Sequence, residues 1–269
     1  MTPASRAREE HPMSKTEIFT KIPNIQYTEE APQIAVEEFR KTVKSRRSVR
    51  VFDGSPVPEH VMRECLELAL LSPNSSNLQP WEFHWVRSPE KKAKLVKYCL
   101  SQPAAATAAE LIVCVARTAT WKKNAKQMLK TFEQAKTPVP ASAKAYYAKL
   151  VPLVYGQGPL GVFGLLKRGG VFLRGIFTVT PREPVSPADM RLWASKTTAL
   201  GCQTLMLAFR AHGFDTCPME GQDSARVRAL LGLPRDAVIV MTLGVGKRAS
   251  NGIYGPRVRF DSSLFIYEQ

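Results

Sequence analysis

The spacing of apolar positions predicts a chain in which helices alternate with short strands. Apolar residues three and four positions apart indicate amphipathic helices, whereas strict alternation or a short apolar run indicates a strand. Helices are therefore expected at residues 33–44, from Pro58 onward and after a Ser88 cap, with strands at residues 81–86 and 110–116. The face of the second helix that we expect to be buried carries Val61, Leu66, Leu68, Ala69 and Leu70.

The second half of the chain is expected to contain one long helix followed by two strands. Residues 186–189 read Ser-Pro-Ala-Asp, which supplies an N-cap, a proline in the first turn and an acidic third position, so a helix should run from there to about His212. Its centre, residues 197–207, is apolar almost all round and predicts a core helix or a subunit contact. Strands expected at residues 214–217 and 237–245 bring the sheet to four or five strands.

Changes in composition divide the chain into an arm, a domain and an excursion within that domain. Residues 1–33 mix charge, proline and polar residues without a sustained period, and we expect them to form an N-terminal arm. Residues 34–269 are expected to form one domain. Within it, residues 120–185 replace the helix–strand rhythm with a basic segment, a Pro-rich joint and a Gly-punctuated stretch, which predicts a helical excursion.

The Gly-punctuated stretch has two possible roles. Its apolar residues, from Leu160 to Phe177, are interrupted by Lys167, Arg168 and Arg174, a pattern that suits weak contact with a membrane surface. The alternative is a lid over a pocket, packed against a partner subunit. The glycines between residues 156 and 175 disfavour one regular helix and therefore favour the lid.

The charge of the chain suggests an anionic partner. There are 38 Lys and Arg residues against 23 Asp and Glu, a net charge of +15. A nucleic-acid-binding protein without catalysis is the main alternative class, suggested by Lys122, Lys123, Lys126 and Lys130. Aromatic residues are not interleaved with these lysines as base stacking requires, so we expect no nucleic-acid partner. The GVGKR segment is not a phosphate loop, because Met241 stands where that loop needs glycine.

Cysteines, histidines and hydropathy bear on the compartment in which the protein works and on metal binding. The five cysteines are widely spaced, lie in apolar surroundings and form no CxxC pair, which indicates buried thiols in a reducing compartment. The first residues lack the apolar core of a signal peptide, and no run of about 18 apolar residues follows, so a cytoplasmic protein is expected. His60, His84 and His212 are isolated from Cys and acidic partners at ligand spacing, so no metal site is expected.

The first candidate motif is the basic segment RRSVRVF, residues 46–52. In an extended segment, alternate side chains point the same way, so Arg46, Ser48 and Arg50 should share one side and Arg47 the other. Two guanidiniums on either side of a hydroxyl match the oxygens of a phosphate. A solvated basic patch at a helix end is the equally weighted alternative.

The second candidate motif is the polar loop SPNSSNLQPW, residues 72–81. Its small polar residues offer amide and backbone groups to a flat heteroaromatic ring, with Asn77 and Gln79 as candidate ring contacts. An ordinary polar loop with Asx turns is the alternative.

The third candidate motif is CPMEG, residues 217–221, at the end of an expected strand. Glycine lets main chain approach a ligand closely, so the N–H groups of Glu220 and Gly221 are candidates for contact with a ring. A simple turn between strand and helix is the alternative.

The ordered set of these motifs resembles the FMN-dependent nitroreductase family. RRSVRVF is followed by SPNSSNLQPWEF, then by PMEG after the long helix, and by GVGKR and YGPRVRF near the C-terminus. The resemblance covers residues 35–260. It implies an α+β fold in which a small mixed, mainly antiparallel sheet is flanked by helices, with long central dimerisation helices.

The resemblance also implies positions for the cofactor contacts. FMN would lie at the interface of a homodimer, with its ring cradled by a loop from the other subunit. The implied contacts are Arg46, Arg47, Ser48, Arg50, Arg257 and Arg259 around the phosphate and the pyrimidine edge, Pro73, Asn74, Ser75 and Asn77 in the cradling loop, and Pro218, Met219, Glu220 and Gly221 near flavin N5. Where relatives often carry Asn and a basic residue, this chain has Ser101 and Gln102, and we keep Gln102 as a candidate contact.

The activity implied by the resemblance is transfer of electrons from NADH or NADPH to small oxidised acceptors such as nitroaromatics or quinones. Both substrates would use one face of the flavin in turn, which implies ping-pong kinetics. Because flavin N5 carries the chemistry, no catalytic side chain is expected. Arg50 near N1 and O2 would stabilise the charge of the reduced ring.

Overall fold

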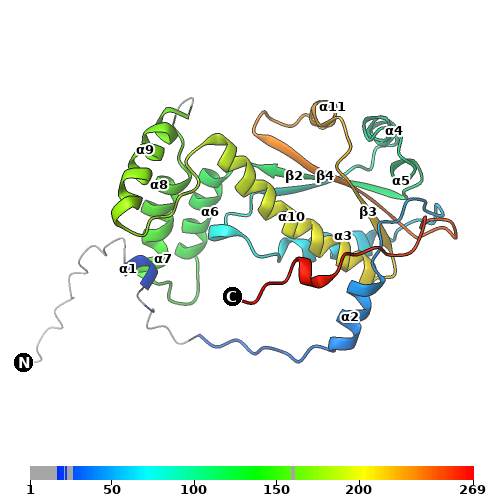
Figure 1. Cartoon of the computed structure of the whole chain (residues 1–269), viewed down its shortest axis with the longest axis horizontal. Helices are drawn as coiled ribbons and strands as arrows, with labels where there is room; N and C mark the ends of the chain where they lie inside the picture. The colour runs from blue at the N-terminus through cyan, green and yellow to red at the C-terminus, as the bar shows by residue number, and fades with distance from the viewer. Residues whose placement is uncertain (1–16, 21, 23–26, 159–160) are drawn as a thin grey trace, which may run out of the picture.

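A computed structural model describes residues 17–20, 22, 27–158 and 161–269 (Figure 1). Its elements, in chain order, are α1 (Glu17–Thr20), α2 (Val36–Ser45), α3 (Glu59–Leu70), η1 (Ser75–Asn77), β1 (Trp81–Trp85), α4 (Pro89–Tyr98), α5 (Pro103–Ala106), β2 (Glu110–Arg117), α6 (Trp121–Glu133), α7 (Ala141–Ala145), the π-helix η2 (Tyr146–Leu150), α8 (Val151–Tyr155), α9 (Val162–Phe177), α10 (Pro187–Ala211), β3 (Asp215–Met219), α11 (Ser224–Leu230), β4 (Ala237–Gly246) and η4 (Ser262–Leu264).

Four strands form one antiparallel sheet in the order β1-β2-β4-β3. Among the described residues, one parallel bridge adds Ser48 to the β3 residue Thr216. Central β2 is buried on both faces, because alternate residues enter two separate cores. Ile112 and Cys114 pack with α3 and α10, whereas Val113 packs on the other side with α4, α5 and α11. The α+β class and the small sheet flanked by helices are confirmed.

Helix α3 corrects one prediction about burial. Its buried residues are Val61, Met62, Cys65 and Ala69. Leu68 and Leu70, which we expected on the buried side, are 38% and 48% exposed. Residues 61, 65 and 69 are four positions apart and share one face, whereas Leu68 and Leu70 project to either side of it. All five cysteines, including Cys65, are buried and free, as predicted.

The long helix α10 begins as the sequence predicts. The Ser186 hydroxyl accepts a hydrogen bond from the backbone N–H of Asp189, at 3.1 Å. The Asp189 carboxylate in turn accepts one from the N–H of Val185, at 2.8 Å. Two orphan donors at the helix start are satisfied in this way. The helix then runs across the sheet and packs against α3 and β2.

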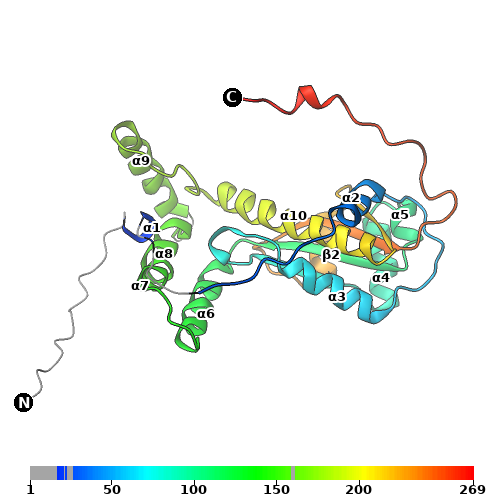
Figure 2. The ribbon, with the colours of Figure 1, turned by 90° about the horizontal axis from the view of Figure 1, so that it is seen from below.

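Helices α6 to α9 form a lobe at one end of the molecule, beside the start of α10 (Figures 1 and 2). Helix α9 spans residues 162–177 without interruption, so the prediction that its glycines disfavour one regular helix is wrong. Two of these glycines serve close packing. A side chain at Gly164 would collide with the Val185 carbonyl, and one at Gly175 would collide with Arg182. Leu160, part of the same prediction, lies outside the described residues.

Two segments of the described chain run outside the compact body. After a contact of Arg257 with the end of α2, the C-terminal segment of residues 256–269 runs well clear of the sheet and helices (Figure 2). Their apolar side chains are exposed: Val258, Phe260, Leu264, Phe265, Ile266 and Tyr267. Residues 27–35 are also exposed and form neither helix nor strand, while most of the predicted arm before them lies outside the described residues. None of the described helices is long and apolar enough to span a membrane.

Candidate functional site

Five arginines and a serine meet around one cavity of about 380 Å³, although they come from two segments some 200 residues apart. Four lining residues belong to the motif that follows α2: Arg46, Arg47, Ser48 and Arg50. The other lining residues are Ile253, Tyr254, Gly255, Pro256, Arg257, Val258 and Arg259. The structure therefore brings together all six residues that we predicted around a phosphate.

Backbone pairing with β3 and with the segment after β4 fixes the basic motif. The Val49 N–H donates to the Thr216 carbonyl at 3.1 Å, and the Arg50 N–H donates to the Gly252 carbonyl at 2.7 Å. The Val49 side chain is fully buried, so its neighbours Ser48 and Arg50 face outward, as alternation predicts. A side chain at Gly252 would collide with the Val51 carbonyl, which explains a glycine at this close approach.

Hydrogen bonds from two arginines close the cavity. Arg47 donates to the Gly255 carbonyl at 2.6 Å, and Arg257 donates to the Lys44 carbonyl at 2.9 Å and to the Arg46 carbonyl. Arg47 thus lines the cavity with its neighbours instead of pointing to the opposite side, which corrects that prediction. Alternation fails at Arg47 because the chain has only just left α2, and because Gly255 draws the guanidinium inward. These bonds join the start of the extended C-terminal segment to the end of α2.

The cavity is electropositive. Among the described residues, no carboxylate forms an ion pair with any of these five arginines. Burial lowers the pKa of the Arg46 guanidinium, and the positive charges of Arg257 and Arg259 lower it further. Nearby Arg210 and Arg248, by contrast, both pair with the buried Asp215. A set of unpaired guanidiniums beside a hydroxyl is the donor set that a phosphate requires.

The segment after β3 lies next to this cavity. The Arg50 guanidinium contacts the Cys217 sulfur at 3.6 Å, so its side chain turns from the cavity toward β3. Pro218 and Met219 belong to the strand, and only Glu220 and Gly221 form the turn, so the strand ends later than predicted. The Gln102 amide donates to the Gly221 carbonyl at 2.9 Å. The structure thus brings Gln102 to the predicted ring contacts.

The polar loop of residues 72–79 is held by the helical lobe. The Ser76 hydroxyl is 2.8 Å from the Tyr155 hydroxyl, and the Ser75 hydroxyl is 3.0 Å from the same group. Tyr147 donates to the Ser76 carbonyl at 2.8 Å. Sequence reasoning missed these tyrosines, since no local signal links residues so far apart. Asn77 has a left-handed φ of 45°. The side-chain amide of Gln79 donates to the side-chain oxygen of Asn77 at 3.3 Å, so the two candidate ring contacts lie side by side.

Within one chain, this loop and the arginine cavity occupy diagonally opposite corners of the sheet. The loop leads into β1, an edge strand whose first residue Trp81 is level with Ala116 near the end of β2. The basic motif is bridged to β3, the other edge strand, which pairs with the far end of β4. The loop residues Pro73, Asn74, Ser75 and Asn77 are accordingly not among the residues that line the cavity of their own chain.

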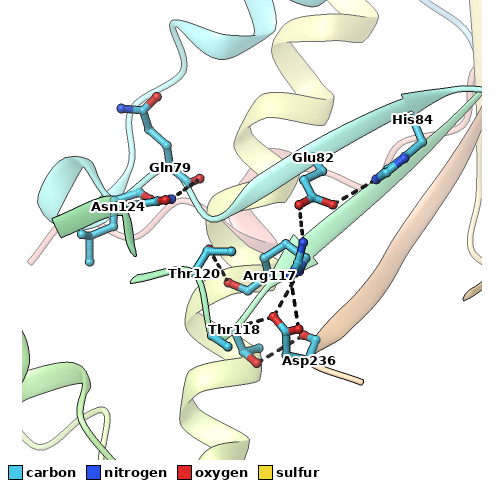
Figure 3. Close-up of polar contacts among 10 residues, drawn as sticks. Gln79, Glu82, His84, Arg117, Thr118, Thr120, Asn124 and Asp236 are labelled. Carbon is cyan, nitrogen blue, oxygen red and sulfur yellow. Dashed lines mark hydrogen bonds and ion pairs between the residues drawn. The ribbon is translucent and has the colours of Figure 1, made fainter. Parts of the chain in front are cut away.

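A polar network anchors the sheet beside this loop (Figure 3). Arg117 of β2 forms ion pairs with Glu82 and, at 3.1 Å, with Asp236. Burial alone would lower the pKa of Arg117, but the hydrogen bond to Asp236 and the two carboxylates outweigh it, and the pKa is raised. Asn124 of α6 donates to the Leu78 carbonyl at 2.7 Å, which ties the lobe to the loop. The network is structural, because its charges are satisfied internally.

The histidines differ from expectation in one respect. The His84 imidazole is 3.0 Å from the Glu82 carboxylate, and that of His212 is 3.5 Å from Glu64, so neither lacks an acidic neighbour. Within the part of the chain that the structure describes, no group of three or more His, Cys, Asp or Glu side chains is placed to hold a metal ion.

Comparison with known proteins identifies the family. Residues 43–247 match the model of the Nitroreductase family, and the chain belongs to this family. It is 28% identical over 220 residues to an NADH dehydrogenase of Thermus thermophilus, covering 81% of this chain and 91% of the relative. It is 26% identical over 188 residues to a 4-nitrobenzoate reductase of Pseudomonas putida, covering 69% of this chain and 73% of that protein.

Solved structures share the fold. YdfN of Bacillus subtilis superposes with a TM-score of 0.68 at 22% identity, covering 87% of this chain and 100% of that chain. A structure from Exiguobacterium sibiricum, solved in complex with FMN, gives a TM-score of 0.60 at 24% identity and covers 91% of this chain and 100% of that one. At these identities the likeness establishes the fold.

Proposed function

We propose that this protein is an FMN-dependent oxidoreductase that passes electrons from NADH or NADPH to small oxidised acceptors such as nitroaromatics or quinones. The observation that carries the proposal is the cavity lined by arginines without carboxylate partners. Membership of the Nitroreductase family supports it, as do relatives named for NADH oxidation and for reduction of 4-nitrobenzoate.

The cavity residues would hold the FMN phosphate. Arg46, Ser48 and Arg259 lie around one space and offer charged and neutral donors to its oxygens. Arg257 uses part of its guanidinium to hold the cavity wall, through the carbonyls of Lys44 and Arg46. Phosphate would also relieve the mutual repulsion that lowers the pKa of Arg46.

The segment after β3 would orient the ring. When bound, FMN supplies the redox chemistry, by accepting a hydride at N5 and passing it to the acceptor. The backbone N–H groups of Glu220 and Gly221 would face N5, with the turn held by Gln102. Arg50, directed toward Cys217, would place its positive charge at the pyrimidine edge. No side chain is required as a proton donor, and the two substrates would use one face in turn, which gives ping-pong kinetics.

We further propose that the active form is a homodimer with two shared sites. The loop of residues 73–77 is too far from the cavity of its own chain to cradle the same ring, so a second copy would supply it. Exposed apolar residues provide an interface: Val36, Phe39 and Val43 on α2, Leu192 and Leu200 on α10, and the apolar residues of the C-terminal segment. Residues 34–269 would form this unit, with residues 1–33 as an arm.

The absorption spectrum of the purified protein tests the cofactor assignment. A flavin band at about 450 nm, with release of FMN on denaturation, is the expected result. Protein that is colourless and does not bind FMN on reconstitution would refute the assignment. Binding of FAD or riboflavin with equal affinity would also contradict it, because the cavity is matched to a single phosphate group.

A mixed-dimer experiment tests the shared site. An Arg46→Ala chain lacks a phosphate contact, and a chain with a bulky Ser75→Trp change has an altered cradling loop. Refolding the two variants together, and assaying at an FMN concentration too low to load the Arg46→Ala site, should restore one site per mixed dimer, up to about a quarter of wild-type activity. No recovery, in protein that light scattering shows to be dimeric, would place both contributions on one chain.

A further inference from the structure

Helix α9 exposes a continuous apolar stripe. The exposed side chains recur three, four or seven positions apart, which places them on one face, and each is more than half exposed: Val162, Leu165, Leu166, Phe172, Leu173 and Ile176. Phe177, the last residue of the helix, is also exposed. An apolar stripe of this length is costly in water and marks an interaction surface.

Hydrogen bonds from Lys167 and Arg182 hold the opposite face of α9 against the lobe. The Lys167 ammonium donates to the carbonyls of Leu153 and Val154 at the end of α8, at 3.4 and 2.5 Å. Arg182, in the segment after α9, donates to the Gly175 carbonyl at 2.8 Å. The helix is therefore held in one orientation, with its apolar stripe directed away from the lobe.

An apolar cavity of about 600 Å³ lies beneath the face of α9 that is turned toward the lobe. Leu150, Leu153 and Val154 line it from η2 and α8, with residues 179–181 and 183–185 on another side. Lys167 and Arg174 of α9 stand in its wall. The cavity and the stripe together offer apolar surface on both sides of α9, with cations between them.

More than half of the net positive charge of the chain lies in the same lobe. Residues 120–185 contain eleven Lys and Arg residues against two Glu, so this quarter of the chain carries a net charge of +9 out of +15. Arg168 is exposed at the edge of the apolar stripe, and α9 itself has no acidic residue. Such a lobe attracts an anionic surface and repels a second copy of itself.

The length of α9 limits how it can meet a membrane. With 16 residues the helix is too short to cross a bilayer, and no described helix is long and apolar enough to do so. A helix with one apolar stripe and cations on its other side lies in the plane of the interface, with its stripe in the acyl region.

We propose that α9 and the basic lobe around it dock this protein onto the surface of an anionic lipid membrane. The stripe enters the interface, Arg168 at its edge meets the lipid phosphates, and the net positive charge of residues 120–185 attracts the lobe to the anionic surface. The proposal is independent of the bound cofactor, because none of the stripe residues lines the arginine cavity.

Co-sedimentation with lipid vesicles tests the docking surface, using the full chain as purified. At low salt the protein should sediment with vesicles of equal parts phosphatidylcholine and phosphatidylglycerol, and far less with phosphatidylcholine alone. Salt at about 0.5 M should reduce binding several-fold, because it screens the lobe. A Leu166→Ser/Phe172→Ser double variant should bind at least about tenfold more weakly, since both apolar side chains leave the interface.

Matched variants separate the stripe and its charge from general effects. Leu71→Ser removes an apolar side chain that is 78% exposed at the end of α3, and it should bind as the wild type does. Arg168→Gln should weaken binding to anionic vesicles, whereas Lys94→Gln on exposed α4 should not. Melting curves check that each variant is folded, and a Phe172→Trp variant should shift its emission to the blue with vesicles.

Three results would overturn the proposal. One is absence of binding to anionic vesicles at low salt. Another is equal binding by the Leu166→Ser/Phe172→Ser variant and the wild type in folded protein. The third is dissociation of the dimer by that double variant, seen by light scattering, which would make a second copy of this chain the occupant of the stripe.

Discussion

Gln102 donates a hydrogen bond from its side-chain amide to the backbone carbonyl of Gly221, at 2.9 Å, across 119 positions of sequence. The same amide donates to the Cys99 carbonyl at 3.0 Å. Leu100 and Ser101 lie between Cys99 and Gln102 in the chain, and both have left-handed φ angles, of 57° and 51°. A turn that is unfavourable for ordinary residues is thus held in place beside the proposed flavin N5 position.

We therefore expect Gln102→Leu to lower kcat more than FMN affinity. The change removes both amide hydrogen bonds, each worth about 1 kcal/mol net, and lets the Glu220–Gly221 turn move. A three- to tenfold fall in kcat, roughly 1 kcal/mol in the barrier, should accompany a change in the FMN dissociation constant of less than about threefold. Gln127→Leu on exposed α6 is the control. Equal kcat values for both variants would show that the turn is positioned without Gln102.

Arg46→Ala should weaken retention of FMN without altering turnover of protein that still holds it. A hydrogen bond to a charged group contributes about 1.5–3 kcal/mol, so the dissociation constant should rise roughly 10- to 100-fold. Fluorescence of flavin released during dialysis measures the loss. Arg63→Ala, which removes an exposed arginine paired with Glu59 on α3, should leave retention unchanged. If both variants keep FMN equally, Arg46 does not bind the phosphate.

Elements set by local sequence could be predicted, because their causes lie within a few residues. The cap at Ser186 and Asp189 and the buried strand β2 follow from hydrogen-bonding side chains and from an apolar run. The exposure of Ser48 and Arg50 on either side of buried Val49 follows from alternation. These features needed no knowledge of distant contacts.

The features that could not be predicted from the sequence depend on contacts between segments that are far apart in the chain. Arg47 turns toward the cavity because Gly255 lies there, and the loop around Ser76 is held by Tyr155 of the lobe. The glycines of α9 indicate a broken helix when local propensity is considered alone. Gly175 instead makes room for Arg182, and such packing is visible only in three dimensions.

The tyrosine contacts of the polar loop give a prediction about stability. The Tyr155 hydroxyl is within hydrogen-bonding distance of both Ser75 and Ser76, and Tyr155 is buried. Tyr155→Phe should therefore reduce the free energy of unfolding by about 1–2 kcal/mol, because Ser75 loses its tyrosine partner and Ser76 keeps only the Tyr146 hydroxyl. Tyr98→Phe is the matched control, and urea denaturation measures both. A difference below about 0.5 kcal/mol between the two variants would mean that water replaces the tyrosine.

The start of α10 gives a prediction about pH. The N–H of Val185 and the groups of Ser186 hydrogen-bond the Asp189 carboxylate and hold its pKa below the ordinary value. A lowered pKa means that the folded state prefers the charged carboxylate, so this stabilisation is complete above about pH 5 and is lost as the pH falls through the lowered pKa. Asp189→Asn removes the charge at the helix N-terminus, which contributes about 0.3–1 kcal/mol in this position.

The melting temperature of Asp189→Asn should therefore lie below that of the wild type by a few degrees at pH 7. The gap should shrink steadily below about pH 4, because the wild-type carboxyl group then also becomes neutral. Glu67→Gln, an exposed change on α3, should show little difference at either pH. A gap for Asp189→Asn that stays constant from pH 7 to pH 3 would assign the effect to altered hydrogen bonding instead of charge.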